Sequence, residues 1–292
     1  MPDACPDRAA PGSPHAAAPT PSTSAGAAPG NPATAPVVAA FDFDGTLTTG
    51  GSVWPFLVAV AGWRPVVTAA VMVLPRLVLA GLLGGRHADR AKEALFRHTL
   101  AGRSEAAVAA RAASFGTEHF RRRARSDVVA HLQAHRAAGH PVAVVSASPE
   151  LYLRPVAEAL GVDALIATGL AVDDEGRLTG GYAGGNCRGP AKLARVRHWA
   201  QAVAGGTAPG EPGGAVLWAY GNSAGDRELL AGAAVPINVG RLGRAGRLRR
   251  FPGLHDAPPV APGNAPRHTA APQHTAAPQQ ADDPGFPQAG TP

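Results

Sequence analysis

Short apolar runs alternate with helix-like segments through the middle of the chain. The apolar runs are bounded by Gly, Pro or small polar residues, a pattern typical of buried strands. They cover residues 35–41, 142–145, 165–168, 216–220 and 235–239. Helical segments separate the runs, among them one that Gly161 stops and one that Gly189-Pro190 opens. Strands that alternate with helices predict an α/β fold with a parallel sheet and right-handed crossovers.

One long stretch between the first two strands lacks strand signals. Apolar and basic residues follow helical spacing over residues 86–100 and 104–138, until Gly139-His140-Pro141 breaks the pattern. A mostly helical insertion, which we call the cap, is therefore predicted at residues 51–135. Further along, a small hairpin is predicted to turn at residues 173–176.

Within the cap, residues 66–83 are apolar and long enough to raise the question of a membrane span. Pro75 and Arg76 lie in the middle of this segment, and a central arginine costs roughly 2.5–3.5 kcal/mol on insertion scales. Two helices broken at Pro75 are therefore expected in place of a span. One alternative is that the two helices form ordinary cap core. The other is that they form an apolar surface that admits a lipid phosphate and contacts a membrane peripherally. The basic residues that flank it are Arg64, Arg86 and Arg90.

Both ends of the chain are rich in Ala, Pro, Ser, Thr and Gly and lack apolar periodicity. Such segments cannot bury enough surface to offset the entropy of ordering, so residues 1–34 and 251–292 are predicted to be disordered tails. The α/β core is then expected at residues 35–50 and 136–250, on either side of the cap. This length is enough for one large core with a subdomain.

The formal net charge of +6 comes mainly from arginine, including the run at residues 121–125. No aromatic interleaving or recognised nucleic-acid motif accompanies the basic residues, so no nucleic-acid partner is expected. The cysteines are Cys5 and Cys187, which indicates no disulfide framework and fits a reducing cytoplasm. The N-terminus also lacks a basic segment followed by an apolar core, as a secretory signal would have. We expect a cytoplasmic protein, with membrane association as the alternative that the apolar cap leaves open.

The first strand ends in the sequence FDFDGT at residues 41–46. Side chains alternate along a strand, so Asp42 and Asp44 point the same way. Two neighbouring carboxylates are costly to bury unless a cation shares the site. The pair suits one carboxylate as nucleophile and the other as proton carrier. A calcium loop is set aside because, counted from Asp42, the glycine comes too early and Val53 stands where the bidentate glutamate belongs.

Polar residues follow the later strands in a definite order. Ser146 ends the second strand, and Ser148 is a good N-cap for a helix with Pro149 at its first position. Lys192 lies in the first turn of a later helix, and the sequence GNSAGD at residues 221–226 follows the next strand. In parallel sheets ligands bind outside the carboxyl ends of the strands, where all these residues fall.

This order of motifs resembles the haloacid dehalogenase superfamily of phosphohydrolases. The large insertion directly after the first motif is similar to that of its subfamily IB, the phosphoserine-phosphatase-like branch. The resemblance covers roughly residues 36–240 and implies a Rossmann-like core with a parallel sheet and an inserted helical cap. The first motif, FDFDGT, is quite specific, and the fourth motif, GNSAGD, is moderately so, whereas Ser146 and Lys192, the second and third motifs, gain weight only from their order.

The resemblance implies an Mg²⁺-dependent phosphomonoester hydrolase that acts on a small substrate through an aspartyl-phosphate. Asp42 would attack phosphorus, and Asp44 would protonate the leaving alcohol and then deprotonate water. Ser146 and the backbone N–H of Ala147 would hold a phosphoryl oxygen, while Lys192 neutralises charge. The implied metal ligands are Asp42, the Asp44 carbonyl, Asn222 and Asp226.

Two departures from the family pattern bear on function. Asn222 stands where an aspartate is usual, which removes a charge from the metal site and makes a catalytically weakened phosphate-binding module one alternative. No acidic residue occurs between Asp44 and Asp89, so this segment cannot pair with an ammonium group and phosphoserine is a poor candidate substrate. The apolar cap is similar to that of phosphatidylglycerophosphate phosphatases of the same branch. A lipid-phosphate phosphatase at the membrane surface is therefore a second alternative.

Overall fold

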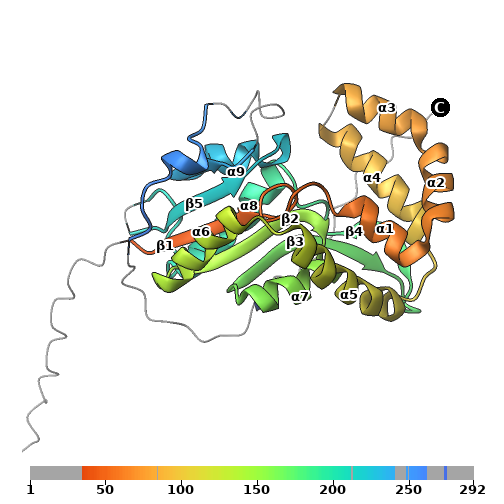
Figure 1. Cartoon of the computed structure of the whole chain (residues 1–292), viewed down its shortest axis with the longest axis horizontal. Helices are drawn as coiled ribbons and strands as arrows, with labels where there is room; N and C mark the ends of the chain where they lie inside the picture. The colour runs from red at the N-terminus through yellow and green to blue at the C-terminus, as the bar shows by residue number, and fades with distance from the viewer. Residues whose placement is uncertain are drawn as a thin grey trace, which may run out of the picture. The chain divides into compact units, whose positions relative to one another are not determined.

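The computed structural model of the chain describes residues 35–83, 85–211, 213–240, 248, 250–261 and 273–274 (Figure 1). Most of the two predicted tails lies outside these described residues, and their predicted disorder stays a prediction. Figure 1 shows a central sheet with helices on both faces and a further group of helices beside one end of the strands.

Six strands form a mostly parallel sheet in the order β4-β3-β2-β1-β5-β6. Their bounds are β1 Val37–Asp42, β2 Val142–Pro149, β3 Ala164–Val172, β4 Leu178–Ala183, β5 Val216–Gly221 and β6 Val235–Asn238. Strand β4 pairs antiparallel with β3, and a two-residue strand, β7 (Gln273–His274), also pairs with β3. The predicted α/β class is confirmed, and the predicted hairpin joins β3 to β4.

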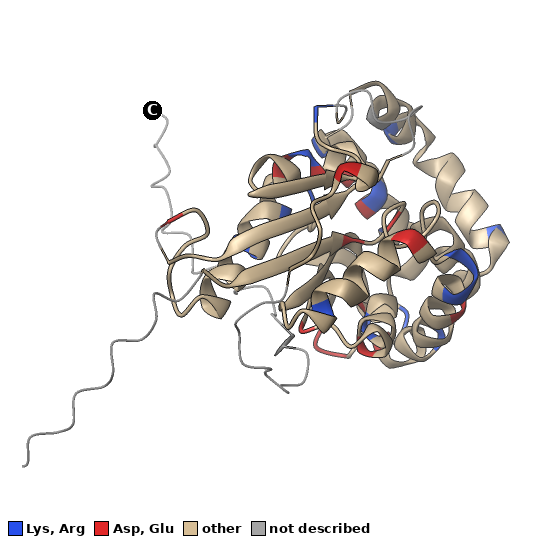
Figure 2. Ribbon diagram, turned by 60° about the vertical axis from the view of Figure 1, so that its left-hand side comes forward, with Lys and Arg blue, Asp and Glu red and all other residues tan. Residues whose placement is uncertain are grey.

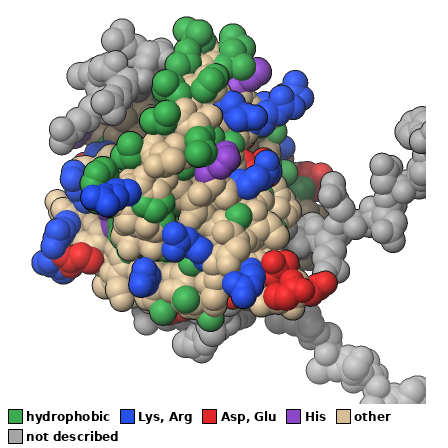
Figure 3. All heavy atoms as spheres, turned by 90° about the vertical axis from the view of Figure 1, so that its right-hand side faces the viewer, with side chains coloured by type: hydrophobic (Ala, Val, Ile, Leu, Met, Phe, Trp, Pro, Cys, Tyr) green, Lys and Arg blue, Asp and Glu red, His purple; other side chains and the backbone are tan. Residues whose placement is uncertain are grey.

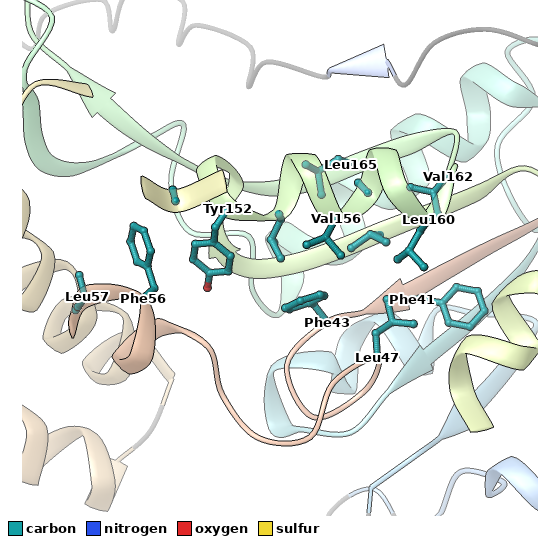
Figure 4. Packing of buried hydrophobic residues seen from close by; sticks show 14 of the residues in the cluster. Phe41, Phe43, Leu47, Phe56, Leu57, Tyr152, Val156, Leu160, Val162 and Leu165 are labelled. Atoms are coloured by element: carbon teal, nitrogen blue, oxygen red, sulfur yellow. The ribbon is translucent and has the colours of Figure 1, made fainter. Parts of the chain in front are cut away.

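Apolar side chains cover both faces of β1, which explains why this strand reads as a continuous apolar run. Val38 and Ala40 belong to one buried cluster, and Ala39 and Phe41 belong to another. Phe41 stacks on Tyr220 of β5 with ring centroids 4.1 Å apart. Figure 4 shows the second cluster continuing from the end of β1 into the first helix of the insertion, so the core holds the loop after β1 in place.

Helices fill the chain between β1 and β2. They are α1 Val53–Ala61, α2 Trp63–Met72, α3 Leu74–Leu83, α4 Gly85–Leu100, α5 Glu105–Arg123 and α6 Ser126–Ala137. Helices α1 to α4 pack on one another, α5 packs on α1 and α7, and α6 packs on β1 and β2. The last helix of the predicted cap range therefore lies on the sheet. The later helices are α7 Glu150–Leu160, α8 Pro190–Val203 and α9 Arg227–Ala231.

The apolar segment of the cap forms two short helices. Among the described residues, no single helix is long and apolar enough to cross a membrane. Helices α2 and α3 meet the length and composition of a span only when taken together, and they are bent by 70° at the break between them. The break falls at Val73, and Pro75 lies inside the first turn of α3. A proline is tolerated there because the N–H it lacks would have no partner within the helix.

The start of α7 differs from the prediction. Strand β2 continues to Pro149, which is itself the N-cap, and the helix begins at Glu150. The prediction that Ser148 caps this helix was wrong because the Ser148 hydroxyl donates to the carboxylate of Asp44. The other end follows the sequence, since Gly161 ends α7 in the left-handed conformation with φ 63°.

The chain after β6 also departs from the prediction, because the predicted disordered tail begins too early. Residues 250–261 are described, and Leu254, Ala257 and Val260 pack against the second cluster. The Asn238 N–H donates to the Pro252 carbonyl at 2.8 Å. These three residues are spaced three apart and bury apolar surface against the core, which the overall composition of the tail does not indicate.

Candidate active site

The loop after β1 presents two carboxylates at the carboxyl end of the sheet. Asp42 ends β1 and is buried, Phe43 fills the core, and Asp44 is half-buried. The backbone turns at once, because the N–H groups of Thr46 and Thr48 both donate to the Phe43 carbonyl, at 3.2 and 3.0 Å. With Phe43 anchored inward, Asp42 and Asp44 are left on the other side of the chain, as strand alternation predicts.

Lys192 connects the first motif to the last. The first turn of α8 buries this lysine, and its Nζ lies 2.7 Å from Asp42 Oδ1 and 2.6 Å from Asp226 Oδ1. The three side chains are 2%, 7% and 1% exposed, respectively. Figure 2 shows acidic and basic residues gathered at this end of the strands. The structure thus brings three residues predicted from separate motifs into one buried ion-paired group.

One ammonium group between two carboxylates leaves an excess negative charge in this group. Burial and the neighbouring charge of Asp226 raise the pKa of Asp42 to about 7, although Lys192 opposes the rise. Burial also acts to raise the pKa of Asp226, but the charge and hydrogen bond of Lys192 and the hydrogen bonds of Ser223 leave it below its usual value. The pKa of Lys192 lies above its ordinary value because the attraction of both carboxylates outweighs burial. Asp226 is therefore the more firmly ionised partner of Lys192, while Asp42 gives up its proton only as the pH rises through about 7.

A chain of hydroxyl groups holds Asp44. Its Oδ1 accepts the Ser52 N–H at 2.6 Å, and its Oδ2 accepts the Ser148 hydroxyl. The Ser52 hydroxyl lies 2.6 Å from the Tyr152 hydroxyl and 3.4 Å from that of Ser148. Ser52, Ser148 and Tyr152 are fully buried, so these bonds fix the orientation of the Asp44 carboxylate.

The sequence predicts that Asp44 transfers a proton, and on that prediction Ser148→Ala should lower kcat by about tenfold with little change in KM, because Asp44 loses a donor that orients its carboxylate. Steady-state kinetics on a soluble phosphomonoester would measure the effect. Thr117→Ala is the matched control, since the Thr117 hydroxyl bonds only within the exposed face of α5, to the Ala113 carbonyl. Wild-type kcat in a folded Ser148→Ala protein would show that this bond does not position Asp44.

The residues predicted to hold phosphate lie beside Asp42. In the pairing of β1 with β2, Asp42 is opposite Val145, so Ser146 is the next residue toward the site. Ser146 is buried, and its Oγ accepts the Ser148 N–H at 3.0 Å. The carbonyl of Ala147 accepts hydrogen bonds from Lys92 Nζ at 2.7 Å and Thr168 Oγ1 at 2.8 Å. These two bonds hold the Ala147–Ser148 peptide in one orientation.

Asn222 lies directly against the first motif. A Cβ placed on Gly45 would come 2.0 Å from Asn222 Nδ2, so only glycine fits at this position, where φ is 82°. Thr46 Oγ1 donates weakly to Asn222 Oδ1 at 3.4 Å. This contact brings the amide oxygen of the fourth motif next to the loop that carries Asp42 and Asp44.

The donors at this end of the sheet suit a hard cation. Carboxylate, amide and backbone carbonyl oxygens from the loops after β1 and β5 meet here, and oxygen-only sets are what Mg²⁺ prefers. Among the described residues, no group of three or more His, Cys, Asp or Glu side chains could hold a metal ion. A metal site would thus depend on Asn222 and a backbone carbonyl. Both oxygens of Asp226 are occupied, Oδ1 by Lys192 and Oδ2 by Ser223 and the Asn222 N–H.

Two adjoining cavities open from the site. The first, of about 690 Å³, is lined by both loops, including Asp44, Gly45 and Asn222. The second, of about 1070 Å³, lies between α1 and α5. Residues 49–51 line both cavities, so the two adjoin at the loop after the first motif. The charged and titratable residues that line the second cavity are Arg111, Glu118, His119, Arg122 and Arg123.

Sequence reasoning missed the residues that support the site. Ser148 could have been found, since it stands two positions after Ser146 on a strand and so shares its face. Lys92 donates to Asn186 Oδ1 at 2.8 Å as well as to Ala147, and this contact ties α4 to the core. No local pattern marks Ser52 or Lys92, because the partners of the Ser52 hydroxyl and of the Lys92 ammonium are distant in the chain.

The chain is similar to known proteins in both sequence and fold. Residues 39–231 match the family described as haloacid dehalogenase-like hydrolase. Protein CicA of Caulobacter vibrioides is 37% identical over 196 residues, which cover 67% of this chain and 82% of that protein. A protein with unknown function from Bordetella pertussis Tohama I superposes with a TM-score of 0.62 and 27% identity, over 75% of this chain and 98% of that one. A phosphoserine phosphohydrolase-like protein from Francisella tularensis shares the fold, with a TM-score of 0.53 and 14% identity over 74% of this chain and 94% of that one.

Proposed function

This chain belongs to the haloacid dehalogenase-like hydrolases, and from that premise we propose that it is an Mg²⁺-dependent phosphomonoester hydrolase that works through an aspartyl-phosphate. The observation that carries the proposal is the buried group of Asp42, Lys192 and Asp226, with Asp44 on the same loop. A nucleophile, a fixed positive charge and a proton carrier meet at the carboxyl ends of the strands, where a parallel sheet binds its ligands.

In the first step, an Asp42 oxygen forms a bond to phosphorus while the bond from phosphorus to the leaving oxygen breaks. Asp44 gives its proton to that leaving oxygen. Lys192 balances the charge that spreads over the phosphoryl oxygens and Asp42, and Ser146 with the Ala147 N–H binds one of those oxygens. In the second step, Asp44 removes a proton from water, the water oxygen attacks phosphorus, and the bond to Asp42 breaks.

The oxygens of Asp42, the Asp44 carbonyl and Asn222 would hold Mg²⁺, which neutralises phosphate charge and orients the group for in-line attack. Asp226 acts indirectly in this arrangement, because Lys192 and the 222–223 backbone engage its oxygens. Its task is to keep Lys192 charged and to hold the loop that carries Asn222.

The test is phosphate release from a panel of phosphomonoesters, with Mg²⁺ and with EDTA. Multiple turnovers that EDTA abolishes and Mg²⁺ restores are expected. Turnover that is indifferent to EDTA would contradict the metal requirement. The absence of turnover on every substrate, together with tight Mg²⁺-dependent binding of beryllium fluoride, would favour the phosphate-binding module instead.

The second candidate function is a phosphate-binding module without turnover. It is favoured by Asn222, whose amide lacks the negative charge that a carboxylate would add to the metal site. Asn222→Asp separates the two functions. If the chain is an enzyme, this variant should bind Mg²⁺ more tightly and reach half-maximal activity at lower Mg²⁺. If the chain is a module, added charge will tighten binding of the metal without producing turnover.

We expect Mg²⁺ to raise the melting temperature more at about pH 8 than at about pH 5.5. The pKa of Asp42 is raised to about 7, so at lower pH a proton competes with the metal for this carboxylate. Because the pKa is above its unfolded value, ionising Asp42 destabilises the metal-free fold as the pH rises through about 7. Thermal unfolding with Mg²⁺ and with EDTA across this range measures the difference. An Mg²⁺ effect that does not vary with pH would argue against Asp42 as a ligand.

The second cavity favours a leaving group that is neutral or anionic. Three arginines line it, at positions 111, 122 and 123. Glu118, the acidic residue among its described lining, is already paired with Arg121 and Arg122. Among the described residues that line this cavity, none is free to pair with an ammonium group, which agrees with the absence of an acidic residue from residue 45 to residue 88. We propose a small phosphomonoester other than phosphoserine as substrate.

A further inference from the structure

An uncommon amount of apolar surface lies on the outward face of α2 and α3. We call it the α2–α3 surface, and it consists of Trp63, Val67, Val71, Met72, Leu74, Val78, Leu79, Leu82 and Leu83. Leu82 is 77% exposed and Val71 is 64% exposed. Among the described residues, the large exposed hydrophobic side chains outside this surface are Trp54 and Val172. Soluble monomers rarely leave so contiguous an apolar patch in water.

Helix α2 is apolar on both sides, and in α3 Leu77 packs against the core while Leu74, Leu79, Leu82 and Leu83 are exposed. In α2 the inward positions Val66 and Ala69 are buried, and Val73 after it is buried too. A helix on the surface of a soluble protein would have polar residues on its other face. Here the outward positions are apolar as well, so ordinary cap core accounts for only one side of the pair.

The unpaired charges around the surface are basic, because Asp89 and Glu93 of α4 are paired with Arg188 and Arg97. Arg64, Arg76, Arg86 and Arg90 are exposed, and no ion pair joins any of them to another described residue. No acidic residue occurs between Asp44 and Asp89. Figure 3 shows hydrophobic side chains gathered over one part of this side of the molecule, with basic side chains around them.

The bent shape of α2 and α3 suits helices that lie in a membrane interface better than helices that cross the membrane. The 70° bend between α2 and α3 prevents the pair from forming one straight membrane-crossing rod. Two short helices that lie in an interface bury their outward apolar residues while the arginines reach anionic headgroups. Trp63, at the start of α2 and 63% exposed, has the amphipathic ring that favours the headgroup level.

We propose that the α2–α3 surface docks on the anionic surface of a lipid bilayer. A second copy of the chain is the less suitable occupant, because its α2–α3 surface would bring the same arginines, and residues 45–88 hold no acidic residue to pair with them. An anionic bilayer is complementary in both charge and apolarity. Docking of this kind does not depend on the hydrolase activity, since none of the residues of the α2–α3 surface lines either described cavity.

Flotation of the full chain with vesicles tests the proposal. Binding is expected to vesicles of phosphatidylcholine with phosphatidylglycerol, to be much weaker with phosphatidylcholine alone, and to weaken as salt screens the arginines. The variant Leu79→Ser/Leu82→Ser should lower the partition coefficient at least about tenfold, since burial of each leucine favours the bound state. Arg64→Gln/Arg76→Gln should flatten the salt dependence. Leu77 is avoided because it is partly buried against the core.

Val172→Ser is the matched control, because Val172 is exposed at the end of β3, outside the α2–α3 surface. It should bind vesicles like the wild type, and all variants should keep the wild-type melting temperature and turnover of a soluble substrate. Wild-type protein that ignores anionic vesicles overturns the proposal. So does equal binding by Leu79→Ser/Leu82→Ser. Concentration-dependent dimers that the same double substitution abolishes, without vesicle binding, would assign the surface to a second copy instead.

Discussion

Asp42→Asn should lower phosphate release by about four orders of magnitude or more, because an amide oxygen cannot form the proposed aspartyl-phosphate. The melting temperature, in contrast, should not fall. The pKa of Asp42 is raised to about 7, so at about pH 8 the wild-type fold holds a buried ionised carboxylate that asparagine replaces with a neutral group. We therefore expect the metal-free variant to melt at the same or a higher temperature than the wild type.

Phosphate assays and thermal unfolding in EDTA measure the two effects together. Asp174→Asn, in the exposed turn between β3 and β4, is the matched control and should change neither. Turnover that survives Asp42→Asn would refute the nucleophile assignment. Loss of turnover together with a lower melting temperature would point to damage of the fold instead.

Lys192→Met should lower both activity and stability. Lys192 is the ion-pair partner of two buried carboxylates, Asp42 and Asp226, and breaking a buried pair by removing one partner costs about 3–5 kcal/mol. Activity should fall by about a thousandfold, because the phosphoryl charge loses its fixed counter-charge. Chemical denaturation and steady-state kinetics at neutral pH measure the two losses.

The stability loss in Lys192→Met should depend on pH. Without the lysine, burial raises the folded pKa of the carboxylates above the unfolded values, so the variant loses stability as the pH rises. In the wild type, the lowered pKa of Asp226 acts in the opposite direction. The difference between the two proteins should thus shrink toward acid. A difference that is constant with pH would mean that Lys192 contributes packing in place of charge, and Arg197→Gln, exposed on the same helix, should change little.

Much of the fold was predictable because its signals are local. The apolar run before Asp42, the glycine that ends α7 and the proline that opens α8 each act within a few residues. The predictions failed where a distant partner decided the outcome. Ser148 has the chemistry of an N-cap, but an aspartate 104 residues earlier takes its hydroxyl.

The sequence by itself determined the chemistry of the site. Alternation along β1 placed Asp42 and Asp44 on one side of the chain, and the first turn of a helix placed Lys192 at the same edge of the sheet. These positions follow from covalent geometry and from the rule that parallel strands bring their carboxyl ends together. Only the tertiary structure decided which groups pair, because Lys192 bonds to Asp42 across 150 residues and to Asp226 across 34, and no local pattern predicts either contact. Packing likewise decided that α2 and α3 leave an apolar face outward, since a sequence that is apolar all round does not say which side its neighbours will cover.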